Sequence, residues 1–125
     1  MRNAIATKDA PQAIGPYSQG IRAGNMLFVS GQGHLDPETG ALVTGDVAAM
    51  TRRVMDNIGA ILTAAGASFD HVVRTTVYLA DMGDFAAMNA VYGEYFSAPA
   101  PARTTIQAAR LPRDMRVEID VIATL

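Results

Sequence analysis

Hydrophobic side chains recur at steps of three and four residues between Asp46 and Gly66, which is the spacing of an amphipathic helix. Asp46 is a suitable N-cap for this helix, and Gly66 suits the position just after its last turn. The same spacing predicts a second helix over about residues 84–96. Its hydrophobic stripe consists of Phe85, Met88, Tyr92 and Phe96.

Stretches that are rich in β-branched residues or that alternate in polarity predict six strands. The last strand is the most regular, because hydrophobic and acidic side chains alternate from Val117 to Val121. Gly24 and Asn25 predict a two-residue hairpin turn between the second and third strands. The six predicted strands span about residues 2–7, 18–23, 26–30, 71–80, 103–109 and 115–124.

The predicted order βββαβαββ favours an α+β fold, with a mixed sheet and both helices on one face. The chain has no internal repeat, linker or low-complexity tract, so residues 1–125 are predicted to form a single domain. The strand positions on the other face carry few charges, and self-association through that face is one way to cover it. These positions are Val72, Tyr78, Ile106, Ala108 and Ile122.

The amino-acid composition and net charge argue against several classes of protein. Half of the 125 residues are hydrophobic and 18% are charged, which excludes a mainly disordered chain. The net charge of −2 argues against a nucleic-acid-binding protein, which usually has a basic face. The chain has no cysteine, so disulfides, thiolate nucleophiles and Cys-ligated metals are excluded. Neither a membrane span nor a secretory signal is recognised, and we expect a cytoplasmic protein that does not bind membranes.

Most familiar motifs are incomplete. The segment Gly31-Gln32-Gly33 begins like a dinucleotide fingerprint, but Asp36 occupies the place of the final glycine. A metal site would depend on His34, Asp36 and His71, which lack the spacing of a zinc hydrolase, so no metal is predicted. We interpret His34 as a surface residue or one that packs a loop, rather than as a metal ligand. Cleavage of RNA by the two histidines is disfavoured, because they lie in separate segments without a basic run.

Two charged residues are the main candidates for chemistry. Arg103 follows a Pro-Ala-Pro-Ala break at the start of a predicted strand, where a guanidinium suits the capture of a carboxylate; the alternative is an exposed strand-end charge. Glu118 lies fifteen residues further on, and antiparallel pairing of the last two strands would bring it close to Arg103. A carboxylate in such a partly apolar setting can shuttle protons. The alternatives are an ordinary residue on the polar face of the strand or a structural ion pair with Arg103 or Arg116.

Several ordered blocks of the sequence resemble the reactive intermediate deaminase family, the RidA or YjgF-like proteins. Asp81, Phe85, Asn89 and Tyr92 fit the same pattern between the later blocks. Together the blocks extend through the whole chain, which makes the resemblance far more specific than any single motif. The blocks are AIGPYSQG (13–20), VSGQ (29–32), DPETG (36–40), VRTTVYL (73–79), PARTTIQAARLP (101–112) and VEI (117–119).

The resemblance implies a chorismate-mutase-like fold that assembles as a homotrimer, with three clefts between subunits. It also implies hydrolysis of 2-imino (enamine) acids, such as 2-iminopropanoate and 2-iminobutanoate, to 2-keto acids and ammonia. No cofactor and no metal are implied.

The same resemblance implies roles for individual residues. Arg103 would hold the substrate carboxylate, and Glu118 would position and deprotonate a water molecule. The backbone carbonyl of Thr105 would hold the imine nitrogen, at a position where many family members carry cysteine. Tyr17, contributed by a neighbouring subunit, would close the pocket. The residues that would shape its wall are Ser30, Gly31 and Asn89.

Two other function classes stay open at this stage. Some relatives are described as endoribonucleases or translation inhibitors, although the acidic composition of this chain argues against that activity. A non-catalytic protein that binds a small carboxylate through Arg103 is the other alternative. The presence of Glu118 favours a deaminase over a carboxylate-binding protein, because a second carboxylate beside the ligand would not help to bind an anion.

Overall fold

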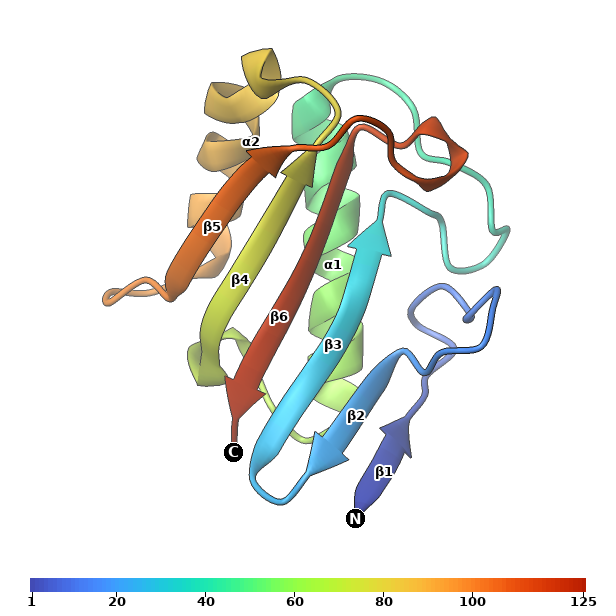
Figure 1. The fold of residues 1–125 in the computed structure, drawn as a ribbon, viewed down its shortest axis with the longest axis vertical. Coiled ribbons are helices and arrows are strands. Elements are labelled where there is room, and N and C mark those ends of the chain that lie inside the picture. Colours follow the sequence, from blue (N-terminus) through green and yellow to red (C-terminus); the bar gives the residue numbers. More distant parts are fainter.

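Six strands form one mixed sheet, and both helices lie on the same face of it (Figure 1). The computed structural model describes residues 1–125. The strands are β1 (Arg2–Ile5), β2 (Gly20–Ala23), β3 (Met26–Gly33), β4 (Val72–Leu79), β5 (Ala102–Gln107) and β6 (Val117–Thr124). The helices are α1 (Val47–Ala64) and α2 (Phe85–Tyr92). The strand order is β1-β2-β3-β6-β4-β5, so the predicted α+β architecture and element order are confirmed.

Helix α1 begins and ends where its sequence predicts. The Asp46 carboxylate accepts a hydrogen bond from the Ala49 amide at 2.8 Å, and Gly66 takes the left-handed φ of 77° that glycine favours after a helix. The inner face of α1 forms the centre of the core, and burial of each aliphatic side chain contributes about 1.5–3 kcal/mol. Its fully buried hydrophobic side chains are Val54, Met55, Ile58, Ile61 and Leu62.

Helix α2 is shorter than predicted. It ends at Tyr92 and continues only as a short 3₁₀ turn, Gly93–Tyr95, because glycine is a poor helix former. The residue before it, Asp84, makes no capping hydrogen bond. Its carboxylate instead accepts two hydrogen bonds from the guanidinium of Arg116, both at 2.8 Å. This ion pair attaches the start of α2 to the start of β6.

Strand β3 is longer than predicted and is irregular near its end. The predicted hairpin is present, with Ala23 opposite Met26 and Gly24 in the left-handed region. Beyond Val29 the register to β6 shifts before Gln32, which is a β-bulge. A bulge changes the direction of the side chains that follow it. The strand continues through the bulge, so Gly31, Gln32 and Gly33, which lie beyond the predicted strand, are part of the sheet.

Strands β5 and β6 do not pair with each other, contrary to the prediction. Strand β4 lies between them, parallel to β5 and antiparallel to β6. The reason is the crossover helix α2, which returns the chain to the same end of the sheet and so allows parallel pairing of β4 and β5. β5 therefore lies at the edge of the sheet, and the chain crosses the end of β4 before it enters β6.

The sheet face without helices keeps large hydrophobic side chains at its surface. Phe28 and Ile106 on this face are 42% and 43% exposed. The prediction was wrong for Val72, which is buried in the core because the register shifts between Val72 and Arg74. Ala108 lies beyond the end of β5. Neither helix is long and apolar enough to cross a membrane.

Candidate functional site

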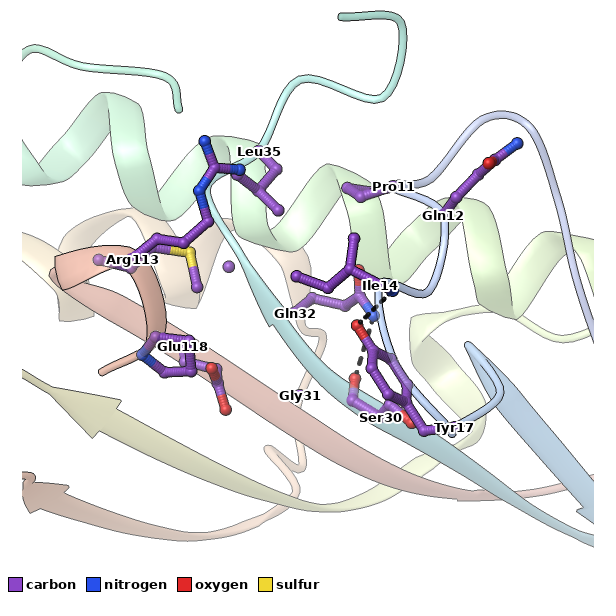
Figure 2. Close-up of a pocket in the computed structure, with 13 residues that line it drawn as sticks. Pro11, Gln12, Ile14, Tyr17, Ser30, Gly31, Gln32, Leu35, Arg113 and Glu118 are labelled. Carbon is purple, nitrogen blue, oxygen red and sulfur yellow. Dashed lines mark hydrogen bonds between the residues drawn. The ribbon is translucent and has the colours of Figure 1, made fainter. Parts of the chain in front are cut away.

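A cavity of about 370 Å³ opens where β3 and β6 meet the loop before β2 and the short turn Pro112–Asp114 (Figure 2). Four of the seven predicted site residues line it: Tyr17, Ser30, Gly31 and Glu118. Sequence reasoning missed other lining residues. Among these are Ile14, Gln32, Arg113 and Met115.

Gln19 organises the loop that forms one wall of this cavity. Its buried side-chain amide donates hydrogen bonds to the carbonyl oxygens of Thr7, Ala10 and Pro11 at 3.1, 3.2 and 2.7 Å. Its side-chain oxygen accepts one from the Thr7 amide at 2.7 Å. One glutamine thus satisfies the backbone of a segment that has no secondary structure of its own. No local pattern in the sequence indicates this role.

Tyr17 and Ser30 close and support the same wall. Tyr17 is 48% exposed at the cavity, and its hydroxyl oxygen accepts a hydrogen bond from the Ile14 amide at 3.3 Å. The Ser30 hydroxyl donates to the Ser18 carbonyl oxygen at 2.6 Å, so it holds the loop. Tyr17 and Glu118 of a single chain already share the cavity (Figure 2).

Gly31 lies directly against the Glu118 carboxylate. A Cβ atom at position 31 would overlap this carboxylate, so only glycine leaves room for the observed position of Glu118. Gly33, which is paired with Glu118 across β3 and β6, makes similar room for the Met115 thioether. The glycines of this segment therefore serve close packing in the cavity wall.

The Glu118 carboxylate is half-buried and has no ion-pair or side-chain hydrogen-bond partner in the chain. Burial raises the pKa of Glu118 above its usual 4.5, and the negative charge of Asp120 raises this pKa further. A carboxylate with a raised pKa is a stronger base than a solvent-exposed one. The geometry therefore suits proton transfer to or from a bound water or substrate.

Arg103 lies outside the cavity, on the edge strand β5. Its guanidinium donates to the side-chain oxygen of Asn89 at 2.7 Å and lies 4.8 Å from the centre of the Tyr92 ring. The Phe85 ring is 5.5 Å away. These α2 contacts hold the cation in a fixed position without a carboxylate partner.

Thr105 follows two residues later on the same strand. Its hydroxyl is buried and has no hydrogen-bond partner. Because β5 pairs only with β4, its outer backbone groups are free to meet another molecule. Arg103, Asn89 and Thr105 thus form a second group of candidate residues, which we call the β5 edge group.

The chain does not bring the β5 edge group and the cavity together. Strand β4 separates β5 from β6, which puts the two strands about 10 Å apart. Arg103 also points toward α2, whereas Glu118 alternates with the buried core residues of β6 and therefore points to the sheet face without helices. The prediction that Arg103 and Glu118 approach each other within one chain is therefore wrong.

His34 is buried, so of the two predicted roles it has the loop-packing one and not the surface one. One ring nitrogen, Nδ1, lies 2.8 Å from the Val43 carbonyl oxygen, and Nε2 accepts a hydrogen bond from the Arg116 amide at 3.0 Å. These partners require a neutral ring with its proton on Nδ1, and burial lowers the pKa of His34. The ring fastens the loop after β3 to the start of β6. No group of three or more histidine and carboxylate side chains is placed to hold a metal ion.

The chain matches known proteins over nearly its whole length. The family model described as Endoribonuclease L-PSP matches residues 7–125. A RutC family protein of Pyrococcus horikoshii is 54% identical, with 98% of each chain covered. The 2-iminobutanoate/2-iminopropanoate deaminase of Escherichia coli is 48% identical, again with 98% of each chain covered. The crystal structure of E. coli TdcF with bound serine has a TM-score of 0.94 and 42% identity, over 98% of each chain.

Proposed function

The chain belongs to the RidA/YjgF family, and from this premise we propose that it hydrolyses small 2-imino (enamine) acids to 2-keto acids and ammonia. The proposed substrates include 2-iminopropanoate and 2-iminobutanoate. Relatives of 48–49% identity that carry the name 2-iminobutanoate/2-iminopropanoate deaminase support this choice. Bound serine in a similar structure supports a site for a small amino-acid-like carboxylate.

The observation that carries the proposal is the separation of two complementary groups. Glu118 in the cavity is a carboxylate without an ion-pair partner, and Arg103 in the β5 edge group is a cation without a carboxylate partner. We propose that a homotrimer places the β5 edge group of one subunit against the cavity of the next. The exposed hydrophobic side chains on the helix-free face support such an assembly, because association would cover them.

In this shared cleft the substrate carboxylate pairs with Arg103, which its contacts with Asn89 and Tyr92 already orient. The backbone carbonyl of Thr105 accepts a hydrogen bond from the imine nitrogen. Tyr17 closes the cleft, while Ser30 and Gly31 form its wall. Every group used is a residue of the protein, and the proposed reaction draws on no cofactor.

Glu118 moves the protons of the proposed reaction. It takes one proton from water as the water oxygen bonds to C2, and the C=N double bond becomes a single bond in a carbinolamine. Glu118 then returns its proton to the nitrogen. The C–N bond breaks and ammonia leaves with the bonding electron pair. Glu118 takes the proton of the C2 hydroxyl, which becomes the keto group, and passes it to the ammonia, so that ammonium is released and Glu118 is again ionised. The absence of cysteine from the chain is compatible with the cytoplasmic location that we propose.

A coupled assay tests the proposal. Threonine dehydratase generates 2-iminobutanoate in the cuvette, and the formation of 2-ketobutanoate is measured with and without this protein. We expect acceleration with the wild type and with Arg52→Ala, which changes a surface arginine paired with Glu94. Arg103→Ala should lose at least about 100-fold in kcat/KM.

Other outcomes point to other uses of the cleft. No acceleration, together with binding of a keto acid that Arg103→Ala abolishes, would replace the enzyme with a carboxylate-binding protein. Cleavage of RNA without imine hydrolysis would favour the activity in the description of the family model. Retained imine turnover in Arg103→Ala would remove Arg103 from the mechanism.

A further inference from the structure

Two side chains outside the proposed catalytic set lie next to Glu118 on the helix-free face. Tyr78 of β4 is directly opposite Glu118 in the antiparallel pairing with β6. Asp120 is two residues after Glu118 on β6, on the same face of the strand. The Tyr78 hydroxyl donates a hydrogen bond to the Asp120 carboxylate at 3.0 Å. We call these two residues the Tyr78–Asp120 pair.

The spacing makes the two carboxylates electrostatic neighbours. Two residues along a strand are about 7 Å apart. At that distance, on a half-buried surface, a second negative charge disfavours the ionised form of the first. The Asp120 charge contributes in this sense to the raised pKa of Glu118, after the larger contribution of burial.

No cation in the chain offsets this effect at close range. The β3 residues that line the cavity are uncharged: Ser30, Gly31, Gln32 and Gly33. Arg113 also lines the cavity, but its guanidinium donates to the Gly40 carbonyl oxygen at 2.9 Å. Arg74 of β4 lies on the same sheet face as Asp120, and its guanidinium donates to the Thr104 hydroxyl of β5 at 2.8 Å, on the side away from β6. Arg116 is paired with Asp84. In the proposed assembly the substrate carboxylate neutralises the Arg103 of the neighbouring subunit.

We propose that the Tyr78–Asp120 pair keeps Glu118 a strong base, with Asp120 supplying a fixed negative charge and Tyr78 holding that charge in place. The effect of the Tyr78–Asp120 pair on the base strength of Glu118 does not depend on the substrate. Its effect on the rate of imine hydrolysis rests on the proposed function. Neither residue needs to touch the substrate, so both are positioning residues.

Tyr78 holds the Asp120 carboxylate in place beside Glu118. Burial, followed by the hydrogen bond to Asp120, raises the pKa of the Tyr78 phenol, so it stays a donor at neutral pH. Its hydrogen bond restrains the Asp120 side chain on the helix-free face. Without this donor the Asp120 side chain would be free to turn away from Glu118 into solvent.

The direct test follows the carbon-13 signal of the Glu118 carboxyl group by NMR during a pH titration, with Glu118→Gln used to assign it. Asp120→Asn should move the titration of Glu118 down by about 0.5–1 pH unit. Asp120→Glu, which keeps the charge, should leave it nearly unchanged. Tyr78→Phe releases the Asp120 side chain and should move the titration of Glu118 in the same direction by a smaller amount.

The chain contains a matched control for these variants. Tyr95 donates to the Asp56 carboxylate at 2.8 Å on α1, away from the cavity. Asp56→Asn therefore removes one carboxylate from an equivalent tyrosine–aspartate hydrogen bond. It should leave the Glu118 titration unchanged, which separates a local effect from a change in net charge.

Enzyme kinetics provide the second readout. The acidic limb of the pH dependence of kcat/KM should move to lower pH in Asp120→Asn by the same amount as the NMR titration. If the wild type does not hydrolyse imines but Asp120→Asn still shifts the titration, the Tyr78–Asp120 pair acts as proposed and the proposed function fails. An unshifted titration in folded Asp120→Asn would overturn the inference. Should that variant fail to fold, the two other variants still test the inference. An unshifted titration in Tyr78→Phe would overturn the role of Tyr78, and a shifted titration in Asp120→Glu would overturn the role of the fixed charge.

Discussion

The cavity and the β5 edge group differ in charge and in construction. Glu118 in the cavity has no ion-pair partner, and Arg103 at the edge has no carboxylate partner. Both residues are partly buried, whereas an ion pair such as Arg110 with Asp114 is exposed to solvent. Because a partly buried charge without a partner is costly, Glu118 and Arg103 are the groups expected to meet a ligand or another subunit.

The cavity and the β5 edge group are also held in place by different kinds of contact. The edge consists of a regular strand and helix, in which α2 orients Arg103. The cavity consists of a loop, a bulge and two glycines, and its shape depends on single contacts such as those of Gln19 and Gly31. We therefore expect conservative substitutions in the cavity to affect function more than comparable ones elsewhere.

The largest effect is expected when the base is removed from the cavity. Glu118→Gln keeps the size of the side chain but removes the base, and it should lower kcat for imine hydrolysis by about 10²- to 10⁴-fold. The carboxylate site of Arg103 should remain, so binding of a keto acid should change little. The measurement is steady-state kinetics beside calorimetric binding of 2-ketobutanoate.

Glu94→Gln is a suitable control for this variant. It removes an exposed carboxylate that is paired with Arg52 on the outer side of the helices. Its kcat should equal that of the wild type. A normal kcat in Glu118→Gln would show that water is activated by another group.

A smaller effect tests the close packing of the cavity. Gly31→Ala introduces a Cβ atom that overlaps the Glu118 carboxylate and must displace it. We expect a loss of about 10- to 100-fold in kcat/KM, because a displacement of about 1 Å is enough to misplace a catalytic group. Gly93→Ala has open space around it and should be silent. Equal activity of both alanine variants would mean that Glu118 has no fixed position.

The pH dependence of stability tests the raised pKa of Glu118. The folded state binds this proton more tightly than the unfolded state, so wild-type stability falls as pH rises from 4.5 through the folded pKa. Glu118→Gln removes this loss and should be more stable than the wild type above that range, with no gain below pH 4.5. Urea unfolding between pH 4 and pH 8 measures the difference. A variant that loses stability at pH 8 would contradict the account.

The smallest expected effect concerns the support of the cavity wall by His34. Burial lowers its folded pKa below 6.5, so the unfolded state takes up this proton first and stability is lost as pH falls below about 6.5. His34→Gln should be less stable at pH 8 and should lack this part of the pH dependence. Identical slopes of stability against pH for the two proteins would rule out the neutral, hydrogen-bonded ring.

The sequence predicts well those parts of the fold that depend on neighbouring residues. Asp46 and Gly66 mark the ends of α1 because capping and left-handed φ are local properties. The same holds for the hairpin turn at Gly24. The candidate residues themselves were also recognisable, because the resemblance depends on ordered blocks of sequence.

The parts that the sequence does not predict depend on contacts between distant segments. The position of β4 between β5 and β6, and hence the separation of Arg103 from Glu118, follows from strand pairing that no local pattern specifies. The bulge in β3 resembles a loop in sequence, since Gly31 and Gly33 are typical of turns. Gln19 and His34 are polar residues whose burial depends on backbone partners elsewhere in the chain.

Mixing two inactive variants tests most directly whether one site is shared between two subunits. Arg103→Ala and Glu118→Gln are unfolded, combined in equal amounts and refolded, and imine hydrolysis is measured against each variant alone. A shared site works where one subunit supplies Arg103 and its neighbour supplies Glu118, each with a chance of one half. The mixture should therefore regain about a quarter of wild-type activity. A mixture no more active than the sum of the separate variants would contradict a site built from two subunits.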